Sequence, residues 1–271
     1  MPFVTVRDLR MYYEIRGAGP RLLSISGTGG DLRRSPNIFE MPIVHHFEIL
    51  VYDQRGLGQT SRPDISYTMA DYAGDANGLL DAMGWERCLV MGISFGGMVA
   101  QEFALRYPHR VERLVLACTS SGGAGGASYP LHEITHLGVE DYVRRVLQLS
   151  DTRRDAVWQA ANPAQFEVLF DQTLVGLRVG ADEPGRQIGI RRQLEARACH
   201  DTYERLPNLR MPVYICGGRY DGIATPANLE AMQKQIPGAR LELFEGGHLF
   251  FIQDPRAFER IVAFLRGELD D

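Results

Sequence analysis

The chain of 271 residues has no long apolar run and no recognisable secretory signal sequence at its N-terminus. No stretch approaches the roughly 18 consecutive apolar residues that a bilayer span needs, and no basic segment followed by an apolar one stands at the N-terminus. These absences argue against a membrane-spanning helix and a secretory signal. We therefore expect a cytoplasmic protein.

Lysine is almost absent as well. Lys234 is the only one, and the formal net charge at pH 7 is −5. A surface that follows a nucleic-acid backbone or an anionic membrane needs clustered positive charge. We therefore expect no nucleic acid and no membrane as partner, but a small molecule. The sequence does not indicate an oligomeric state.

Cysteine is sparse and scattered. The four are Cys88, Cys118, Cys199 and Cys216, and two of them fall within strand-like apolar runs. Isolated cysteines in such runs are typical of buried free thiols, whereas disulfide frameworks belong to small secreted domains. We expect no disulfide framework.

Apolar residues make up 45% of the chain, enough for one large core. Short β-rich runs alternate with stretches whose apolar residues recur every three to four positions, the pattern of an α/β protein. The predicted strands are Phe3–Val6, Met11–Ile15, Leu22–Ser26, Glu48–Asp53, Cys88–Gly92, Arg113–Cys118, Val213–Cys216 and Arg240–Phe244. The predicted helices in the same pattern are Met69–Met83, Gly97–Tyr107, Leu229–Ile236 and a terminal helix from about Pro255 to Leu269.

The alternation is interrupted in the middle of the chain. Residues 120–128 are rich in glycine and serine, which predicts a flexible connector. From about Val139 to Thr202 the pattern is helical throughout, and strands resume afterwards. We therefore predict one sheet domain, residues 1–120 and 206–271, with an inserted helical cap at residues 121–205.

One short motif carries a nucleophile. Residues 92–96 read Gly-Ile-Ser-Phe-Gly, which matches G-x-S-x-G, with an apolar strand before it and a helix after it. The small residues let the chain turn sharply from strand to helix and hold Ser94 in a strained backbone conformation. This turn predicts Ser94 as a nucleophile, with the backbone N–H of Phe95 at the start of the helix as an oxyanion donor.

A serine hydroxyl is a weak nucleophile, so it needs a positioned imidazole and a carboxylate that orients the imidazole. Asp221 and His248 each follow a predicted strand within a glycine-rich loop. Parallel sheets gather such loops at the carboxyl edge of the strands. We predict His248 as the general base and Asp221 as its orienting acid.

Other residues of the same types fit these roles less well. Four histidines lie in connections or at helix ends: His45, His46, His109 and His200. Asp201 and Asp254 are alternative acids, but neither follows a strand. Asp254 is better explained as the N-cap of the last helix, with Pro255 at its first position.

A second glycine-rich loop follows the strand at 22–26. Its sequence, Ser26-Gly27-Thr28-Gly29-Gly30, completes neither the G-K-[ST] nor the G-x-G-x-x-G phosphate motif. We predict the backbone N–H of Thr28 as the second oxyanion donor. A tight turn without a catalytic part is the alternative.

Taken together, these motifs resemble the α/β-hydrolase superfamily over nearly the whole core. Residues 52–61, Tyr-Asp-Gln-Arg-Gly-Leu-Gly-Gln-Thr-Ser, resemble its D-x-R-G-x-G-x-S turn, and 96–111 resemble the helix that follows the nucleophile in enol-lactonases and small-molecule esterases. The resemblance implies the α/β-hydrolase fold, a mostly parallel sheet flanked by helices, with a cap and no cofactor. One departure is Ser26 before Gly27, where the family usually has His-Gly.

The implied activity is a serine hydrolase that cleaves a carboxylic ester or lactone of a small molecule through an acyl-enzyme. Ser94 departs from the aspartate that haloalkane dehalogenases and epoxide hydrolases use, and Ile93 from the asparagine frequent in C–C hydrolases. C–C bond hydrolysis, perhydrolysis and a slow-turnover small-molecule receptor stay open as alternatives. The aromatic residues Trp158, Phe166 and Phe170 of the cap could line the substrate pocket or simply pack.

A second short motif points to a different chemistry, that of a bound metal ion. Residues 132–136, His-Glu-Ile-Thr-His, match H-E-x-x-H, which on a helix would place two imidazoles on one face for zinc. The match directly follows the glycine-rich segment and Pro130, leaves room for only a short helix before Gly138, and has no third ligand at a familiar spacing. We therefore predict no metal site.

Overall fold

The computed structural model describes residues 2–269, and eight strands of that range form one sheet in the order β1-β2-β4-β3-β5-β6-β7-β8. β1 pairs with β2 and β2 with β4 in antiparallel fashion, and all other neighbours are parallel. The strands are β1 Phe3–Val6, β2 Leu9–Arg16, β3 Arg21–Ile25, β4 Glu48–Tyr52, β5 Cys88–Ile93, β6 Val111–Ala117, β7 Val213–Gly218 and β8 Arg240–Phe244. The predicted mostly parallel α/β sheet is confirmed.

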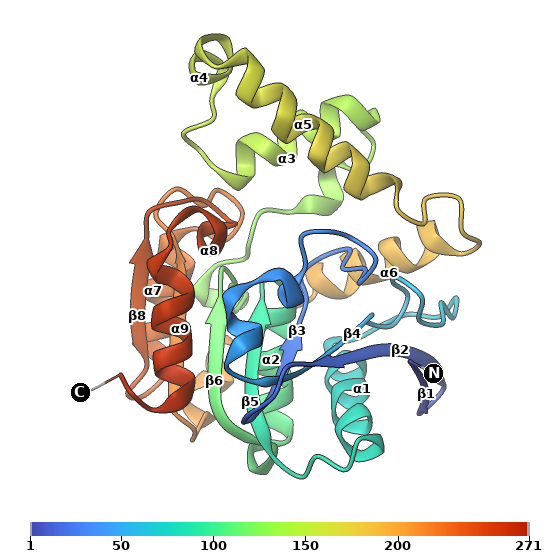
Figure 1. Ribbon diagram of the computed structural model, residues 1–271, viewed down its shortest axis with the longest axis vertical. Helices are drawn as coiled ribbons and strands as arrows, with labels where there is room; N and C mark the ends of the chain where they lie inside the picture. Colours follow the sequence, from blue (N-terminus) through green and yellow to red (C-terminus); the bar gives the residue numbers. More distant parts are fainter. Residues whose placement is uncertain (1, 270–271) are drawn as a thin grey trace.

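Helices cover both faces of the sheet (Figure 1). They are α1 Met69–Ala82, α2 Phe95–Arg106, α3 Val139–Ser150, α4 Ala156–Ala161, α5 Pro163–Arg178, α6 Arg186–Ala198, α7 Pro226–Gln235, α8 Phe250–Gln253 and α9 Arg256–Arg266. Short 3-10 helices are η1 Ile38–Glu40, η2 Pro42–His45, η3 Pro108–Arg110, η4 Gly123–Gly125, η5 Leu131–Ile134 and η6 Tyr203–Asn208.

The central strands are apolar on both faces because each face carries a helical layer. On one face Leu23, Leu50 and Val90 pack in a cluster with residues of α1, α2 and α7. On the other, Leu22 and Met91 pack with residues of η1, η2 and α9. The two clusters are the core that fixes the strand ends, and with them the loops that follow.

Residues 121–205, which we call the cap segment, contain α3 to α6. Figure 1 shows α3, α4 and α5 beyond the end of the sheet, with α6 between them and the core. Part of this segment has its own small apolar cluster, in which Val143 and Leu147 of α3 pack against Phe166 of α5. The bounds used for this segment are those predicted from the sequence, and they stay a prediction.

The glycine-rich start of the cap segment is not a loose connector, so that prediction was wrong. Ser120 and Ser121 are 1% and 0% exposed, and the N–H of Thr202 donates to the carbonyl oxygen of Ser121. A Cβ added at Gly122 would lie 1.9 Å from the carbonyl oxygen of His200. The glycines allow close backbone packing here, and composition alone does not distinguish that use from flexibility.

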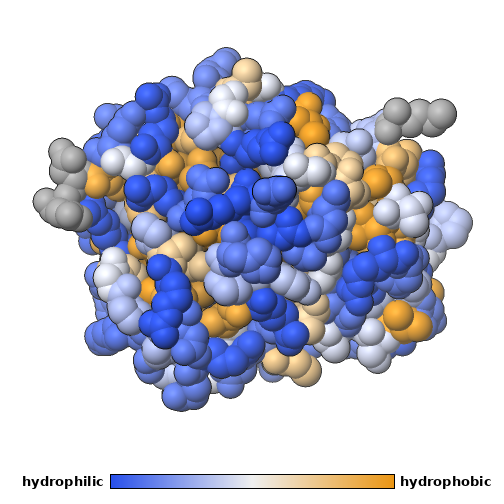
Figure 2. Space-filling view, turned by 90° about the horizontal axis from the view of Figure 1, so that it is seen from below, coloured by the Kyte–Doolittle hydropathy of each residue, from blue (hydrophilic) through white to orange (hydrophobic). Residues whose placement is uncertain are grey.

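The view from below, opposite the cap segment, shows a mainly hydrophilic surface with small, scattered apolar patches (Figure 2). Within residues 2–269, no helix combines the length and apolarity that crossing a membrane requires.

A buried ion pair anchors the turn after β4. Arg55 donates from Nε and Nη2 to the two carboxylate oxygens of Asp75 on α1, at 2.6 and 2.8 Å. Both side chains are almost fully buried, at 2% and 1% exposure. The bidentate geometry satisfies both groups, so the turn and α1 are held together away from water.

We expect Asp75→Asn to lower the free energy of unfolding by about 3–5 kcal/mol, because it leaves a buried guanidinium without its main partner. Asp64→Asn, which removes one of the two acidic partners of Arg192 on the surface, should change the free energy of unfolding by less than about 1 kcal/mol. Urea unfolding of both variants measures the difference. Equal losses in the free energy of unfolding would show that the buried pair of Arg55 and Asp75 stabilises the fold no more than the surface pair does.

Candidate active site

Ser94 stands at the junction of β5 and α2 in a strained backbone conformation, with φ 57° and ψ −118°. Few residues other than glycine adopt such a conformation. The neighbours must be small: a Cβ added at Gly96 would lie 2.0 Å from the carbonyl oxygen of Ile25, and one at Gly92 2.4 Å from that of Gly96. The sequence thus folds here as the sharp strand-to-helix turn that the motif predicts.

Hydrogen bonds hold this turn in place. The N–H of Ser94 donates to the carbonyl oxygen of Ala117 at 2.8 Å, and the hydroxyl of Thr119 donates to the carbonyl oxygen of Ser94 at 2.8 Å. Both partners come from the end of β6 and the residues after it. The strained serine is therefore fixed from the neighbouring strand as well as from its own helix.

The structure brings the three predicted side chains together. Nε2 of His248 lies 2.9 Å from Oγ of Ser94, and Nδ1 of His248 lies 2.7 Å from Oδ2 of Asp221. Positions 94 and 248 are far apart in the chain, and the loops after β5, β7 and β8 bring the side chains into hydrogen-bonding contact. Such a chain can pass a proton from the hydroxyl to the imidazole.

Asp221 is set to hold the imidazole in one tautomer. Its side chain is buried, and Oδ1 accepts from the backbone N–H groups of Ile223 at 2.7 Å and Ala224 at 3.0 Å. Oδ2 is left for Nδ1–H of His248. A proton kept on Nδ1 leaves Nε2 as an acceptor toward Ser94.

The C-terminal end of α3 fixes both loops. The carbonyl oxygen of Ser150 accepts from the N–H of His248 at 2.5 Å, and that of Leu149 accepts from the N–H of Gly222 at 2.9 Å. The side chain of Gln253 accepts from the N–H of Gly247 and donates to the buried Asp151, the C-cap residue that follows α3. The contacts of the Leu149 and Ser150 carbonyl groups could not be predicted from the sequence, because every residue type has a backbone carbonyl group.

The loop of Thr28 lies against the nucleophile. A Cβ added at Gly27 would be 3.8 Å from Oγ of Ser94. The backbone N–H groups of Thr28 and Phe95 donate to no acceptor within residues 2–269, so both are free for a ligand. Gln54 donates to the carbonyl oxygen of Ser26 at 2.8 Å and helps to fix the loop. The role of Thr28 and Phe95 stays a prediction that this geometry allows.

The alternative acids and bases lie in other settings. His200 is buried, with Nε2 3.2 Å from the carbonyl oxygen of Ser120, and burial lowers its pKa to about 4. Asp254 pairs with Arg256, which holds the pKa of its carboxyl far below the ordinary value. α9 begins at Arg256 with Pro255 as its N-cap, so the predicted cap position was wrong by one residue, although the carboxylate of Asp254 accepts from the N–H of Arg256.

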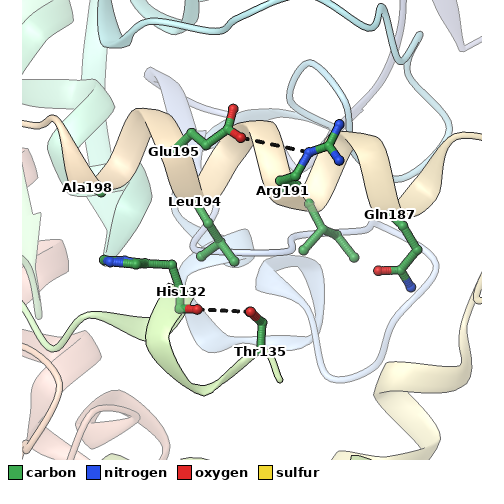
Figure 3. A pocket seen from close by; sticks show the side chains of 8 residues that line it. His132, Thr135, Gln187, Arg191, Leu194, Glu195 and Ala198 are labelled. Carbon is green, nitrogen blue, oxygen red and sulfur yellow. Dashed lines mark hydrogen bonds and ion pairs between the residues drawn. The ribbon is translucent and has the colours of Figure 1, made fainter. Parts of the chain in front are cut away.

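The residues of the zinc motif do not share a helical face. His132, Glu133 and His136 are exposed, and only the first two belong to the short η5. Figure 3 shows His132 at a cavity of about 510 Å³ between η5 and α6. Within residues 2–269, no group of three or more histidine, cysteine or acidic side chains could hold a metal ion.

The aromatic residues of the cap segment pack together. Trp158 and Phe170 lie against the cluster that contains Phe166, and the ring centres of Phe166 and Phe170 are 6.1 Å apart. These contacts match the packing alternative. A role of the three rings in the substrate pocket stays a prediction without a supporting contact.

Comparison with known proteins agrees with the fold. The family model for the α/β-hydrolase fold matches residues 20–255. A protein of Azorhizobium caulinodans, named provisionally as carbamate hydrolase RutD, is 30% identical over 100% of both chains. The poly(3-hydroxyalkanoate) depolymerase of Ectopseudomonas oleovorans is 28% identical over 91% of this chain and 84% of its own.

Among solved structures, the enol-lactonase of Burkholderia xenovorans LB400 superposes with a TM-score of 0.78 at 24% identity, covering 98% of this chain and 100% of that one. A hydrolase from Pseudomonas aeruginosa PA01 has a TM-score of 0.75 at 29% identity, covering 98% and 97%. The chain belongs to the α/β-hydrolase family. Membership of this family supports an enzyme of the hydrolase class, and the eight-stranded sheet described above agrees with it.

We expect Ser94→Gly to be more stable than Ser94→Ala by about 1–3 kcal/mol, because glycine adopts the observed backbone angles without strain. Denaturant unfolding of the two variants measures the difference without any substrate. Equal stabilities would mean that the turn stores no backbone strain at this position.

Proposed function

We propose that the protein is a serine hydrolase that cleaves a carboxylic ester or lactone of a small molecule through an acyl-enzyme. The observation that carries this proposal is the continuous hydrogen-bonded chain from Ser94 through His248 to Asp221. Hydroxyl, imidazole and carboxylate in this order are the parts that nucleophilic acyl transfer requires.

In the first step, Oγ of Ser94 attacks the carbonyl carbon while Nε2 of His248 takes the hydroxyl proton. The N–H groups of Thr28 and Phe95 donate hydrogen bonds to the carbonyl oxygen and stabilise the negative charge that develops on it. When the tetrahedral intermediate collapses, the C–O bond to the alcohol breaks and the imidazolium donates its proton to the departing oxygen. The acyl group is then an ester of Ser94.

In the second step, His248 removes a proton from a water molecule that attacks the acyl carbon. The same N–H groups hold the second oxyanion, and Ser94 leaves with the proton returned from the imidazolium. The products are the acid and the regenerated enzyme; a lactone gives a single hydroxy acid. Asp221 stays ionised throughout and stabilises the imidazolium.

The names of the relatives support hydrolysis at a carbonyl group, and they include more than one kind of cleaved bond. One structural neighbour is named an enol-lactonase, and the relative of 30% identity carries the provisional name of a carbamate hydrolase. A carbamate carbonyl presents the same electrophile with nitrogen on one side. The substrate panel therefore has to contain carbamates beside esters and lactones.

We expect a fluorophosphonate probe to label the wild-type protein and not Ser94→Ala, since the probe reacts with an activated serine. In a panel of p-nitrophenyl esters, lactones and carbamates, Ser94→Ala should lose on the order of 10⁶-fold in kcat on whichever compound the wild type cleaves. Labelling of Ser94→Ala, or turnover by it, would contradict the assignment. Circular dichroism of both proteins controls for folding.

We expect Asp221→Asn to lower kcat by about 10⁴-fold. The amide oxygen would keep the bonds from the N–H groups of Ile223 and Ala224, which turns the amide NH₂ toward His248 and favours the wrong tautomer. Steady-state kinetics on the best ester measures the loss. A decrease of less than tenfold would mean that Asp221 does not orient the imidazole.

A further inference from the structure

One face of α6 carries polar side chains into the interior. Arg186, Gln193 and Arg197 are spaced by seven and four residues, so they lie on the same side of the helix. They are 7%, 0% and 5% exposed. Gln187, Arg191 and Glu195 are exposed, and Figure 3 shows Arg191 paired with Glu195 on the same helix.

The buried face of α6 packs on the core next to the nucleophile. A Cβ added at Gly189 would lie 1.8 Å from the carbonyl oxygen of Gly56. Oε1 of Gln193 accepts from the N–H of Gly29 at 2.8 Å, one residue after Thr28. The helix therefore touches the loop that reaches Ser94.

Arg197 is buried without an acidic partner. Its Nη atoms donate to the carbonyl oxygen of Tyr129 at 2.8 Å and to the hydroxyl of Ser128 at 2.6 Å. Its Nε is buried and makes no hydrogen bond, and no carboxylate pairs with the side chain anywhere in residues 2–269. Burial lowers the pKa of this guanidinium to about 10.

Arg34, which comes from the core, is a second cation without an ion pair within residues 2–269, and its side chain is partly buried. Its Nε is buried and makes no hydrogen bond. Nη1 lies 3.8 Å from the position that a Cβ on Gly29 would take, so the side chain lies against the loop of Thr28. The neighbouring Arg33, in contrast, pairs with Asp31 and Glu183.

The loop of Thr28 links the two arginines, because its Gly29 contacts both Gln193 and the guanidinium of Arg34, and Arg197 lies one helical turn from Gln193. Burial raises the pKa of Tyr142, while the charges of Arg34 and Arg197 both lower it, so both guanidinium groups are within electrostatic reach of its hydroxyl. Nε2 of Gln193 and the hydroxyl of Thr28 are further buried polar atoms without a partner here. Buried positive charge and unused donors are costly unless an anion meets them.

We propose that Arg34, Arg197 and Gln193, next to the loop of Thr28, form a subsite for a carboxylate group of the substrate. The subsite adjoins the loop of Thr28, so the carboxylate and the reacting carbonyl belong to one molecule. The substrate class is then an ester or lactone that carries a free carboxylate. This inference rests on the proposed hydrolase function for the reaction, but not for the binding of the anion.

Binding to the Ser94→Ala protein tests the subsite without turnover. Isothermal titration calorimetry with the methyl half-esters of succinate, glutarate and adipate, and with the three dimethyl esters, separates charge from shape and length. We expect at least one half-ester to bind about 10–100-fold more tightly than its dimethyl ester, the effect of a buried hydrogen bond to a charged group.

Arg34→Gln and Arg197→Gln, each added to Ser94→Ala, should weaken half-ester binding by about 10–100-fold and leave dimethyl ester binding unchanged. Arg197→Lys keeps the charge and should restore part of the affinity. Arg191→Gln, on the exposed face of the same helix, is the matched control and should bind like the parent. Without ligand, Arg34→Gln should unfold at the same or a higher temperature, because it removes a partly buried cation whose Nε makes no hydrogen bond.

Equal binding of half-esters and dimethyl esters at all three lengths, or a preference that survives both glutamine variants, would overturn the subsite. The failure of the hydrolase proposal looks different. A wild-type protein that no fluorophosphonate labels, but that still prefers half-esters through Arg34 and Arg197, would retain the subsite and lose the reaction.

Discussion

The hydrogen-bonded chain from Ser94 through His248 to Asp221 persists only while three separate loops stay within a few tenths of an ångström of their positions. The hydroxyl is 2.9 Å from one ring nitrogen and the carboxylate 2.7 Å from the other, so a small shift of any loop breaks the chain. The parallel sheet meets this requirement first. It ends β5, β7 and β8 at one edge, and the two apolar layers prevent the strands from sliding.

The sheet alone leaves the loops free to move, and the cap segment restrains them. The end of α3 accepts hydrogen bonds from the loops of Asp221 and His248, and Gln193 of α6 accepts one from the loop of Thr28. The cap segment therefore holds the loops of Asp221, His248 and Thr28 against a common support, and in our proposal it also supplies a cation that selects the substrate.

The fold and the three central side chains were predictable because their physical requirements leave marks in the sequence. A strained serine needs glycine neighbours, and a residue at the end of a strand follows an apolar run. The contacts of α3 were not predictable, since they use backbone carbonyl groups. Nor was the packing of residues 120–128, because glycine serves close approach and flexibility alike. The buried polar face of α6 was not predictable, because periodicity locates a face but does not show what covers it.

The account depends on a covalent bond forming at one oxygen atom. Its most direct test is intact-protein and peptide mass spectrometry of the wild-type protein, quenched in acid during turnover of a slowly deacylating ester. We predict an increase equal to the mass of the acyl group, located on the peptide that contains Ser94 and absent in Ser94→Ala. Turnover with no adduct on Ser94 under any quench, or an adduct on another residue, would contradict it.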